Sequence, residues 1–328
     1  FSHGDTTGIF QFESEGMKNL LRRMQPRNME DIACAMALYR PGASRHIPSY
    51  LENRNRKGNV TSGYDSQVQL ILKDTCGIMI YQEQVMSVAR VMAGFTLGQA
   101  DILRRAISKK KTDLLSSLKE QFIKGCLNHG HSRNEAEDVF SNIEQFAGYG
   151  FNKSHAVAYS VIAYQLAYLK CHYPLIFYTA LLNSCIGDTR KSAQYIDECR
   201  KRRITVCYPD VNTSESVYRY DEASIILPFT AVATIGTQVS SSLVQERKEN
   251  GPYRSYFDFV ARASLRKLNR THILNLIKAG ALDCFEYNRE TMKNALDDAI
   301  RYGELVRIDN NGVSSINLDL ISTPDIIR

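Results

Sequence analysis

The sequence predicts a mainly α fold in which a multi-helix domain is followed by a smaller domain with two helical hairpins and a few short strands. Three observations support this prediction. Apolar residues recur at helical spacing through the first two hundred residues of the 328. The composition shifts near Ile204, where short β-branched segments appear. Two glycine-bearing turns between helical stretches then follow, about 45 residues apart.

The stretch from Phe146 to Lys170 organises the first domain. Gly148 and Gly150 lie in the loop before it, and Asn152 or Ser154 can cap the helix that follows. Two apolar stripes run along this helix, one of Val157, Val161, Tyr164 and Tyr168, the other of Ile162, Leu166 and Leu169. Because a helix that is apolar on more than one face is normally buried, we expect the central helix of its domain.

Lys153 and His155 lie at the N-terminal end of this helix. A helix N-terminus beside a lysine attracts anions, phosphate above all. The alternative is a capped core helix with two solvated polar residues at its mouth.

The composition bounds the class of protein. A net charge of +6 fits a solvated surface as well as a polyanion partner. The eight cysteines form no Cys-x-x-Cys pair and have no zinc-ligand spacing with the seven histidines, so we expect no metal site and a reducing, cytoplasmic compartment. No signal peptide is visible, and the longest apolar run is too short and too polar to cross a membrane. The chain starts at Phe1, which predicts a piece of a longer protein.

The elements of the first hundred residues follow from spacing and breakers. A helix with Met17, Leu20, Leu21 and Met24 on its core face is ended by Pro26, and a second helix spans 30–39. Residues 53–63 are expected to form a basic surface loop, and 77–81 to form a short strand before a helix that starts near residue 82.

A helix that starts after Thr96 carries Arg104 and Arg105 and runs towards Lys109, Lys110 and Lys111. Adjacent helix residues point about 100° apart, so a triphosphate that wraps the helix edge can meet both guanidiniums, whereas we expect a single core carboxylate not to. The alternatives are a solvated charged face and a buried ion pair with Asp101.

Helices are expected over 114–146, 175–184 and 193–203, and extended segments over 204–206 and 224–227. The first hairpin turn spans Val232 to Gly236 before a helix over 240–247; the second spans 279–282, between helices over 270–278 and 289–302. Backbone amides in such turns can hold a nucleic-acid phosphate. The candidate DNA contacts are Gly236 and Gly280, with Arg266, Lys267 and Arg270 between them and Lys109, Lys110 and Lys111 in the first domain.

Five stretches together resemble one family. They are Thr7–Ser14, Tyr39–Gly42, Ile80–Met86, Ala100–Ala106 and Phe146–His155, and they occur in the family's order and spacing. The resemblance is to the bacterial C-family replicative DNA polymerases, the DNA polymerase III alpha subunits, and it runs from about Gly4 to about Ile300.

The resemblance implies a domain plan: residues 1–205 as the fingers domain, 206–226 as a connecting segment, 227–300 as a tandem helix-hairpin-helix region and 301–328 as the start of the clamp-binding part. It also implies that Arg104 and Arg105 face the triphosphate of the incoming nucleotide, with Lys153 and His155 near the same pocket. Primer–template DNA, nucleotides, the sliding clamp and other replisome subunits are the implied partners.

The family's reaction uses two Mg²⁺ ions held by palm aspartates, which no stretch of this sequence matches. The resemblance therefore implies that these 328 residues bind nucleotide and DNA, and that the isolated chain does not extend a primer.

The sequence departs from the family at two points. Thr234 stands where the first hairpin usually has glycine, so we expect Gly280 to matter more than Gly236. No clear clamp-binding peptide is present, and residues 315–320 are at most an extended segment near its place. The alternative interpretation is a standalone helical DNA-binding module without nucleotide chemistry.

Overall fold

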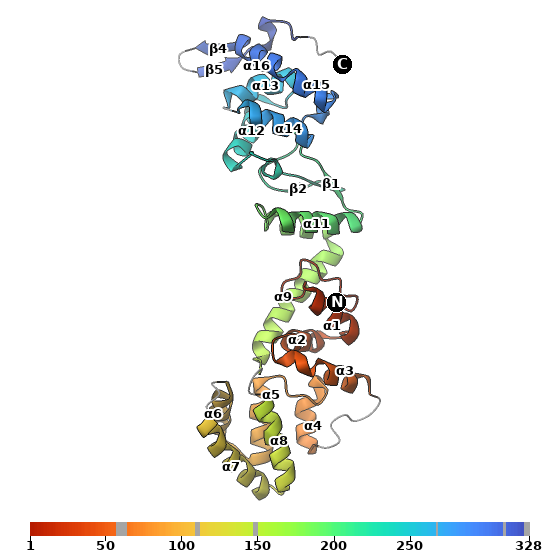
Figure 1. Ribbon diagram of the computed structural model, residues 1–328, viewed down its shortest axis with the longest axis vertical. Coiled ribbons are helices and arrows are strands. Elements are labelled where there is room, and N and C mark those ends of the chain that lie inside the picture. Colours follow the sequence, from red (N-terminus) through yellow and green to blue (C-terminus); the bar gives the residue numbers. More distant parts are fainter. Residues whose placement is uncertain (57–63, 109–111, 147–149, 267, 311–312, 325–328) are drawn as a thin grey trace. The chain divides into compact units, whose positions relative to one another are not determined.

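The computed structural model describes residues 1–56, 64–108, 112–146, 150–266, 268–310 and 313–324. The chain forms two compact units, Phe1–Tyr168 and Leu169–Arg328. Helices dominate each of them, as Figure 1 shows, so the predicted mainly α fold with a few short strands is confirmed. The predicted boundaries at 205, 226 and 300 concern functional domains and stay predictions.

The first helices of unit one surround a common apolar core. They are α1 (Glu15–Met24), α2 (Met29–Leu38) and α3 (Ile47–Asn55), with a 3₁₀ turn at Ala43–His46. Ser14 caps α1 by accepting a hydrogen bond from Met17 N (3.3 Å). The predicted core face of α1 is confirmed, because Met17, Leu20, Leu21 and Met24 are all buried.

A second core of unit one lies between five further helices. These are α4 (Ser66–Leu72), α5 (Gln82–Ala93), α6 (Leu97–Ser108), α7 (Thr112–Asn128) and α8 (Arg133–Phe146), with a 3₁₀ turn at Lys73–Thr75. Phe122 of α7 lies at its centre, with ring centroids 6.1 Å from Phe95 and 5.3 Å from Phe140. The amphipathic pattern predicted for 114–146 therefore does form two packed helices.

The predicted strand over residues 77–81 is wrong. Tyr81 makes only an isolated β-bridge, to Phe151. The side-chain oxygen of Gln84 accepts hydrogen bonds from the backbone N–H groups of Ile80 (2.9 Å) and Tyr81 (3.0 Å). The Gln84 side chain thus pairs the two backbone N–H groups that would otherwise donate to the carbonyl groups of a neighbouring strand.

Helix α9 (Lys153–His172) departs most from the prediction. We expected its large apolar side chains to be buried, yet Val157, Val161 and Tyr164 are 39%, 42% and 51% exposed. The fully buried residues of the helix are small: Ala156, Ser160 and Ala163. Tyr159 and Leu166 are partly buried against the same core, and most of the other large side chains are left on the outside.

Unit two begins with helices and a small sheet. The helices are α10 (Pro174–Asn183) and α11 (Thr189–Lys201), and the strands are β1 (Thr205–Cys207), β2 (Arg219–Tyr220) and β3 (Ser224–Ile226). β3 is central, parallel to β1 and antiparallel to β2. The extended segments predicted near 204–206 and 224–227 are confirmed.

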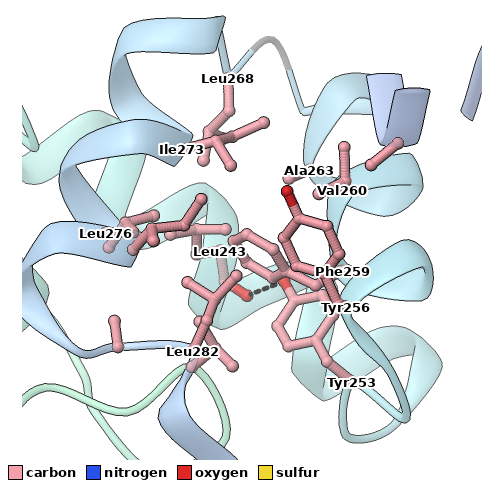
Figure 2. Close-up of a cluster of buried hydrophobic side chains, with 14 of the residues drawn as sticks. Leu243, Tyr253, Tyr256, Phe259, Val260, Ala263, Leu268, Ile273, Leu276 and Leu282 are labelled. Atoms are coloured by element: carbon pink, nitrogen blue, oxygen red, sulfur yellow. Dashed lines mark hydrogen bonds between the residues drawn. The ribbon is translucent and has the colours of Figure 1, made fainter. Parts of the chain in front are cut away.

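The remaining helices of unit two enclose an aromatic-rich core. They are α12 (Thr237–Asn250), α13 (Tyr256–Leu265), α14 (Arg270–Ala279), α15 (Arg289–Asn294) and α16 (Leu296–Leu305), with 3₁₀ turns at Phe229–Ala231 and Asp283–Phe285. Figure 2 shows Tyr253, Tyr256 and Phe259 packed towards leucines of the facing segments. Each buried phenol is satisfied: Tyr256 Oη donates to Met292 O (2.7 Å) and Tyr253 Oη to Leu243 O (3.1 Å).

Two predictions near the C-terminus need correction. The single helix expected over 289–302 is interrupted at Ala295, which ends α15 and precedes α16. The extended segment expected over 315–320 is extended only at its start, in β5 (Val313–Ile316), which pairs with β4 (Arg307–Asn310). Asn317 then accepts a hydrogen bond from Asp319 N (3.1 Å), and a 3₁₀ turn follows at Leu318–Leu320.

Within the ranges that the structure describes, no helix combines the length and the apolar character needed to cross a membrane.

Candidate nucleotide and DNA sites

The loop before α9 is tied to the residues that lead into α5. Phe151 N donates to Ile80 O (3.1 Å), and Gln82 N donates to Phe151 O (2.8 Å). The side chain of Gln82 adds a third bond, from Nε2 to Gly150 O (3.2 Å). These contacts fix the start of α9 relative to α5.

The first turn of α9 is closed by side-chain acceptors. Glu83 accepts from Asn152 Nδ2 and from Lys153 N, each at 2.9 Å. Asn152 Oδ1 accepts from His155 N at 2.8 Å. A phosphate at this helix end would therefore have to displace Glu83 or Asn152 to reach the amides of Lys153 and His155.

A cavity of about 410 Å³ lies beside α9 in unit one. Its lining comes from three separate parts of the chain: Gln11, Glu13, Ser14, Met17, Met36, Tyr39, Arg40, Phe151, His155 and Tyr159. Each of the three parts overlaps with one of the stretches that carry the family resemblance. The fold thus gathers them around one hollow.

Flat rings and a guanidinium dominate this cavity. The Arg40 guanidinium carbon lies 4.4 Å from the centroid of the Phe151 ring. The His155 ring centroid is 4.4 Å from that of Tyr159 and 5.4 Å from that of Phe151. Such a set can contact a planar heterocycle and an anionic oxygen of one ligand.

Of the residues that line this cavity, the sequence analysis predicted only His155 as a nucleotide-binding residue. Arg40, Phe151 and Tyr159 all lie in or beside the stretches that suggested the family, but we assigned functions only to the charged residues at the helix end. The available signal was Arg40 in the stretch Tyr39-Arg40-Pro41-Gly42. A guanidinium next to a helix end, before Pro and Gly, can bind an anion.

The structure separates Lys153 from His155, which the resemblance places near one pocket. Lys153 Nζ lies 5.7 Å from the centroid of the Tyr81 ring. Lys153 lines a smaller cavity of about 70 Å³ together with Glu30 and Asp74. Two residues along a helix correspond to a rotation of about 200°, which directs the two side chains to different sides of α9.

Arg104 and Arg105 both bind Asp101. Arg104 Nη2 lies 2.7 Å from Asp101 Oδ1, and Arg105 Nε lies 2.7 Å from Asp101 Oδ2. Our expectation that one carboxylate could not meet both guanidiniums is wrong, because residues three and four positions along a helix both lie over the same turn. The group is not buried: Arg104, Arg105 and Asp101 have side chains 31%, 66% and 29% exposed.

Arg104 also contacts the loop anchor described above. Its Nη1 donates to Gln82 Oε1 at 3.3 Å, and Gln82 in turn donates to Gly150 O. The arginine helix and the loop before α9 therefore share one glutamine. Lys109, Lys110 and Lys111, which follow α6, lie outside the described residues.

The first hairpin turn of unit two opens a helix. Gly236 is the N-cap of α12, without a side-chain cap hydrogen bond, and no atom lies within 4 Å of a Cβ added there. Thr234 adopts a left-handed conformation (φ 68°), which explains why the family usually has glycine at this position. Asn275 Nδ2 ties the turn to α14 by donating to Thr234 Oγ1 (3.0 Å) and to Ala233 O (3.2 Å).

The second hairpin turn ends a helix. Gly280 (φ 84°) follows α14, and its N–H donates to Ile277 O at 3.0 Å. A Cβ at Gly280 would lie 2.3 Å from Arg289 Nη2. The Gly280 amide is thus already used at the C-terminus of α14, whereas Gly236 lies at the start of α12, and the expected order of the two glycines in DNA binding stays a prediction.

The basic residues between the hairpins are paired with carboxylates. Arg266 Nε lies 2.6 Å from Glu246 Oε2, and Arg270 Nε lies 2.8 Å from Asp297 Oδ1. Their side chains are 32% and 54% exposed, so each retains access to solvent. Lys267 lies outside the described residues.

Two family models match this chain. Residues 1–130 match the bacterial DNA polymerase III alpha subunit finger domain, and residues 203–292 match the helix-hairpin-helix motif. The chain is also 43% identical over 299 residues to the DNA polymerase III subunit alpha of Staphylococcus epidermidis ATCC 12228, which covers 91% of this chain and 28% of that protein.

The chain belongs to the family of bacterial DNA polymerase III alpha subunits. The same named protein of Bacillus subtilis 168 is 42% identical over 310 residues, 94% of this chain and 28% of the relative. That of Staphylococcus aureus MRSA252 is 40% identical over 299 residues, 91% and 28%. This chain thus spans little more than a quarter of the curated alpha subunits it matches.

The family assignment agrees with both regions that the sequence suggested. The finger model includes the Asp101–Arg104–Arg105 group, and the helix-hairpin-helix model includes both Gly236 and Gly280. Clusters of three or more His, Cys, Asp or Glu side chains able to hold a metal ion do not occur among the described residues. The described residues therefore offer no set of three or more such ligands for the Mg²⁺ ions that the polymerase III alpha family implies.

Proposed function

We propose that this chain is the nucleotide- and DNA-binding part of a replicative polymerase, and that in the full-length alpha subunit it holds the incoming nucleotide during template-directed DNA synthesis. The cavity around Arg40, Phe151, His155 and Tyr159 carries this proposal, because it joins ring surfaces and a guanidinium from stretches shared with the family. The nucleotide's ring system lies in this cavity.

Arg104 and Arg105 bind the triphosphate in this proposal, whereas Lys153, which lines a different cavity from His155, is given no contact with the nucleotide. Gln82 supports the assignment, since it contacts both Arg104 and the loop that carries Phe151 before α9. A triphosphate replaces Asp101 as the partner of the two guanidiniums. The three side chains are partly exposed, and a surface ion pair contributes only about 0–1 kcal/mol to stability, so the exchange costs little. Charge-assisted bonds to phosphate oxygens then replace the ion pair.

Duplex DNA is bound by the helix-hairpin-helix region through its backbone. The open N-terminus of α12 at Gly236 is the main phosphate contact. Further contacts in the same region are Arg266, Lys267, Arg270 and Gly280. The lysines at 109–111, which precede this region in the chain, also contact DNA in this proposal. The Mg²⁺ ions of the reaction, the sliding clamp and the other replisome subunits engage the full-length protein in the cytoplasm.

Single-nucleotide incorporation by the full-length alpha subunit on a primed template tests the nucleotide site. Arg40→Ala and Arg104→Ala should each raise the KM for the nucleotide by about tenfold to a hundredfold, the loss of one charge-assisted hydrogen bond. The melting temperature should change little, because both side chains are at least partly exposed.

Arg133→Ala is the matched control. Arg133 forms an exposed ion pair with Glu137 (3.6 Å) one turn along α8, away from the cavity, and its loss should leave the KM unchanged. A wild-type KM in Arg40→Ala and Arg104→Ala, together with a marked drop in melting temperature, would show that these arginines serve the fold and would contradict the proposal.

A further inference from the structure

Glu83 of α5 holds the first turn of α9 at two points. Its Oε1 accepts from Asn152 Nδ2 and its Oε2 from Lys153 N, both at 2.9 Å. Asn152 Oδ1 in turn accepts from His155 N at 2.8 Å. A chain of hydrogen bonds therefore runs from α5 to the residue whose ring lines the larger cavity.

The polarity of this chain specifies a carboxylate at position 83. An amide side chain has one accepting and one donating end, and the accepting end of Asn152 is taken by His155 N. Asn152 must therefore present its donor to residue 83, while Lys153 N presents a second donor. Only a side chain that accepts at both atoms satisfies the two, and a negative charge at a helix N-terminus is additionally favourable.

The neighbouring residue extends the same anchor to the arginine helix. Gln82 donates to Gly150 O (3.2 Å) and accepts from Arg104 Nη1 (3.3 Å). Its backbone N–H holds Phe151 O at 2.8 Å. Residues 82 and 83 thus contact both the arginine group and the loop that carries the cavity's rings.

We infer that Glu83 is a positioning residue for nucleotide binding: through Asn152 and Lys153 it fixes the start of α9, so that Phe151 and His155 present their rings to the cavity. This inference rests on the proposed function of that cavity. Glu83 acts through its neighbours and makes no contact with the nucleotide.

Substitutions at position 83 in the full-length alpha subunit test the inference by single-nucleotide incorporation. Glu83→Ala removes both acceptors and should raise the nucleotide KM about tenfold, while kcat stays within about twofold. Glu83→Gln keeps one acceptor and should give an intermediate KM.

A reversal of polarity provides the sharper test. In Glu83→Gln combined with Asn152→Asp, the new Gln donates to the new Asp and still accepts from Lys153 N, so the chain is restored with donor and acceptor exchanged. The KM should return to within about twofold of the wild type, whereas Asn152→Asp alone sets two carboxylates against each other and should raise it. An unrestored double variant would overturn the inference.

Two further measurements separate this inference from the proposed function. Glu137→Ala, which removes an exposed carboxylate of α8, is the control and should behave as the wild type. The NMR shifts of the His155 ring protons, 4.4 Å from the Tyr159 ring, should change in Glu83→Ala without any nucleotide and recover in the double variant. If the wild-type enzyme shows no saturation by nucleotide, both ideas fall; if it saturates and Glu83→Ala has the same KM, only the positioning role falls.

Discussion

Individual arginines of this chain are mostly satisfied by its own carboxylates, and the group around Glu246 shows the most buried example. Glu246 and Arg262 have side chains only 4% and 8% exposed, and their Oε1 and Nε atoms lie 3.0 Å apart. Arg262 also donates to Gly251 O (2.8 Å) and lies over the Tyr253 ring. This arginine therefore contributes to the fold and is not available for DNA.

The pKa of Glu246 makes this group sensitive to acid. Burial by itself raises that pKa, but hydrogen bonds from Arg266, Arg262 and Asn250 outweigh burial and hold the pKa below its ordinary value. Because the folded-state pKa is the lower one, the stabilisation is complete above the unfolded-state pKa and is lost as the pH falls through the folded-state pKa.

We predict that Glu246→Gln lowers the free energy of unfolding by about 3 kcal/mol at pH 7, since it leaves a buried guanidinium with reduced compensation. The difference from the wild type should shrink as the pH is lowered from 6 to about 3. Urea unfolding across this range measures it. Glu290→Gln is the control, because Glu290 is 67% exposed and pairs with Lys293 on α15, outside this network. Equal stabilities of Glu246→Gln and wild type at pH 7 would contradict the assignment.

At the scale of the elements, the turn before α12 has a conformation that its sequence does not predict. The turn before α12 contains a β-branched residue, Thr234, in the left-handed region (φ 68°), where such residues are strained. The hydrogen bond that the Thr234 hydroxyl accepts from Asn275 offsets part of this strain. Threonine at this position therefore adds strain to the turn.

Thr234→Gly should therefore raise the free energy of unfolding by about 0.5–1 kcal/mol, the relief of strain reduced by the lost hydrogen bond. Thr234→Ala removes the same hydroxyl but keeps the Cβ, so it separates the two terms and should be less stable than Thr234→Gly. Thermal unfolding of the three proteins measures this, and an alanine variant at least as stable as the glycine variant would refute the strain.

On the scale of the molecule, α9 presents large apolar side chains outward. Val161 and Tyr164 are 42% and 51% exposed, whereas the intervening Ala163 is fully buried. Periodicity identified this helix as apolar on two faces and predicted its burial, but residues of both apolar stripes are exposed, among them Val161 and Ile162. Packing density decided the matter, because small residues allow the closest approach of two backbones.

We therefore predict that replacing the larger, exposed valine of α9 costs less stability than replacing the smaller, buried alanine. Val161→Gln should change the free energy of unfolding by no more than about 0.5 kcal/mol, because the position is exposed. Ala163→Gln should cost more than about 2 kcal/mol, because it inserts a larger polar group into a filled core. Chemical unfolding of both variants checks this, and a large loss in Val161→Gln would show that this face is packed in solution.

The sequence by itself determined the helical elements of this protein, their caps and breakers, and the family. Asn152, Pro26 and the apolar spacing of α1 are local signals, and capping, proline chemistry and periodicity are sufficient to read them. Motif order along the chain likewise indicated Arg104, Arg105, Lys153 and His155 before any coordinates.

Only the tertiary structure decided how those residues are grouped. It placed Lys153 and His155 in different cavities, paired both arginines with Asp101, and brought Arg40 from the end of α2 against Phe151 before α9. Contacts between residues more than a hundred positions apart depend on how the helices pack. The local sequence around each residue does not specify that packing. The electrostatic partner of a charged side chain is set by the same long-range packing, so the sequence showed which groups carry the charge but not what each of them meets.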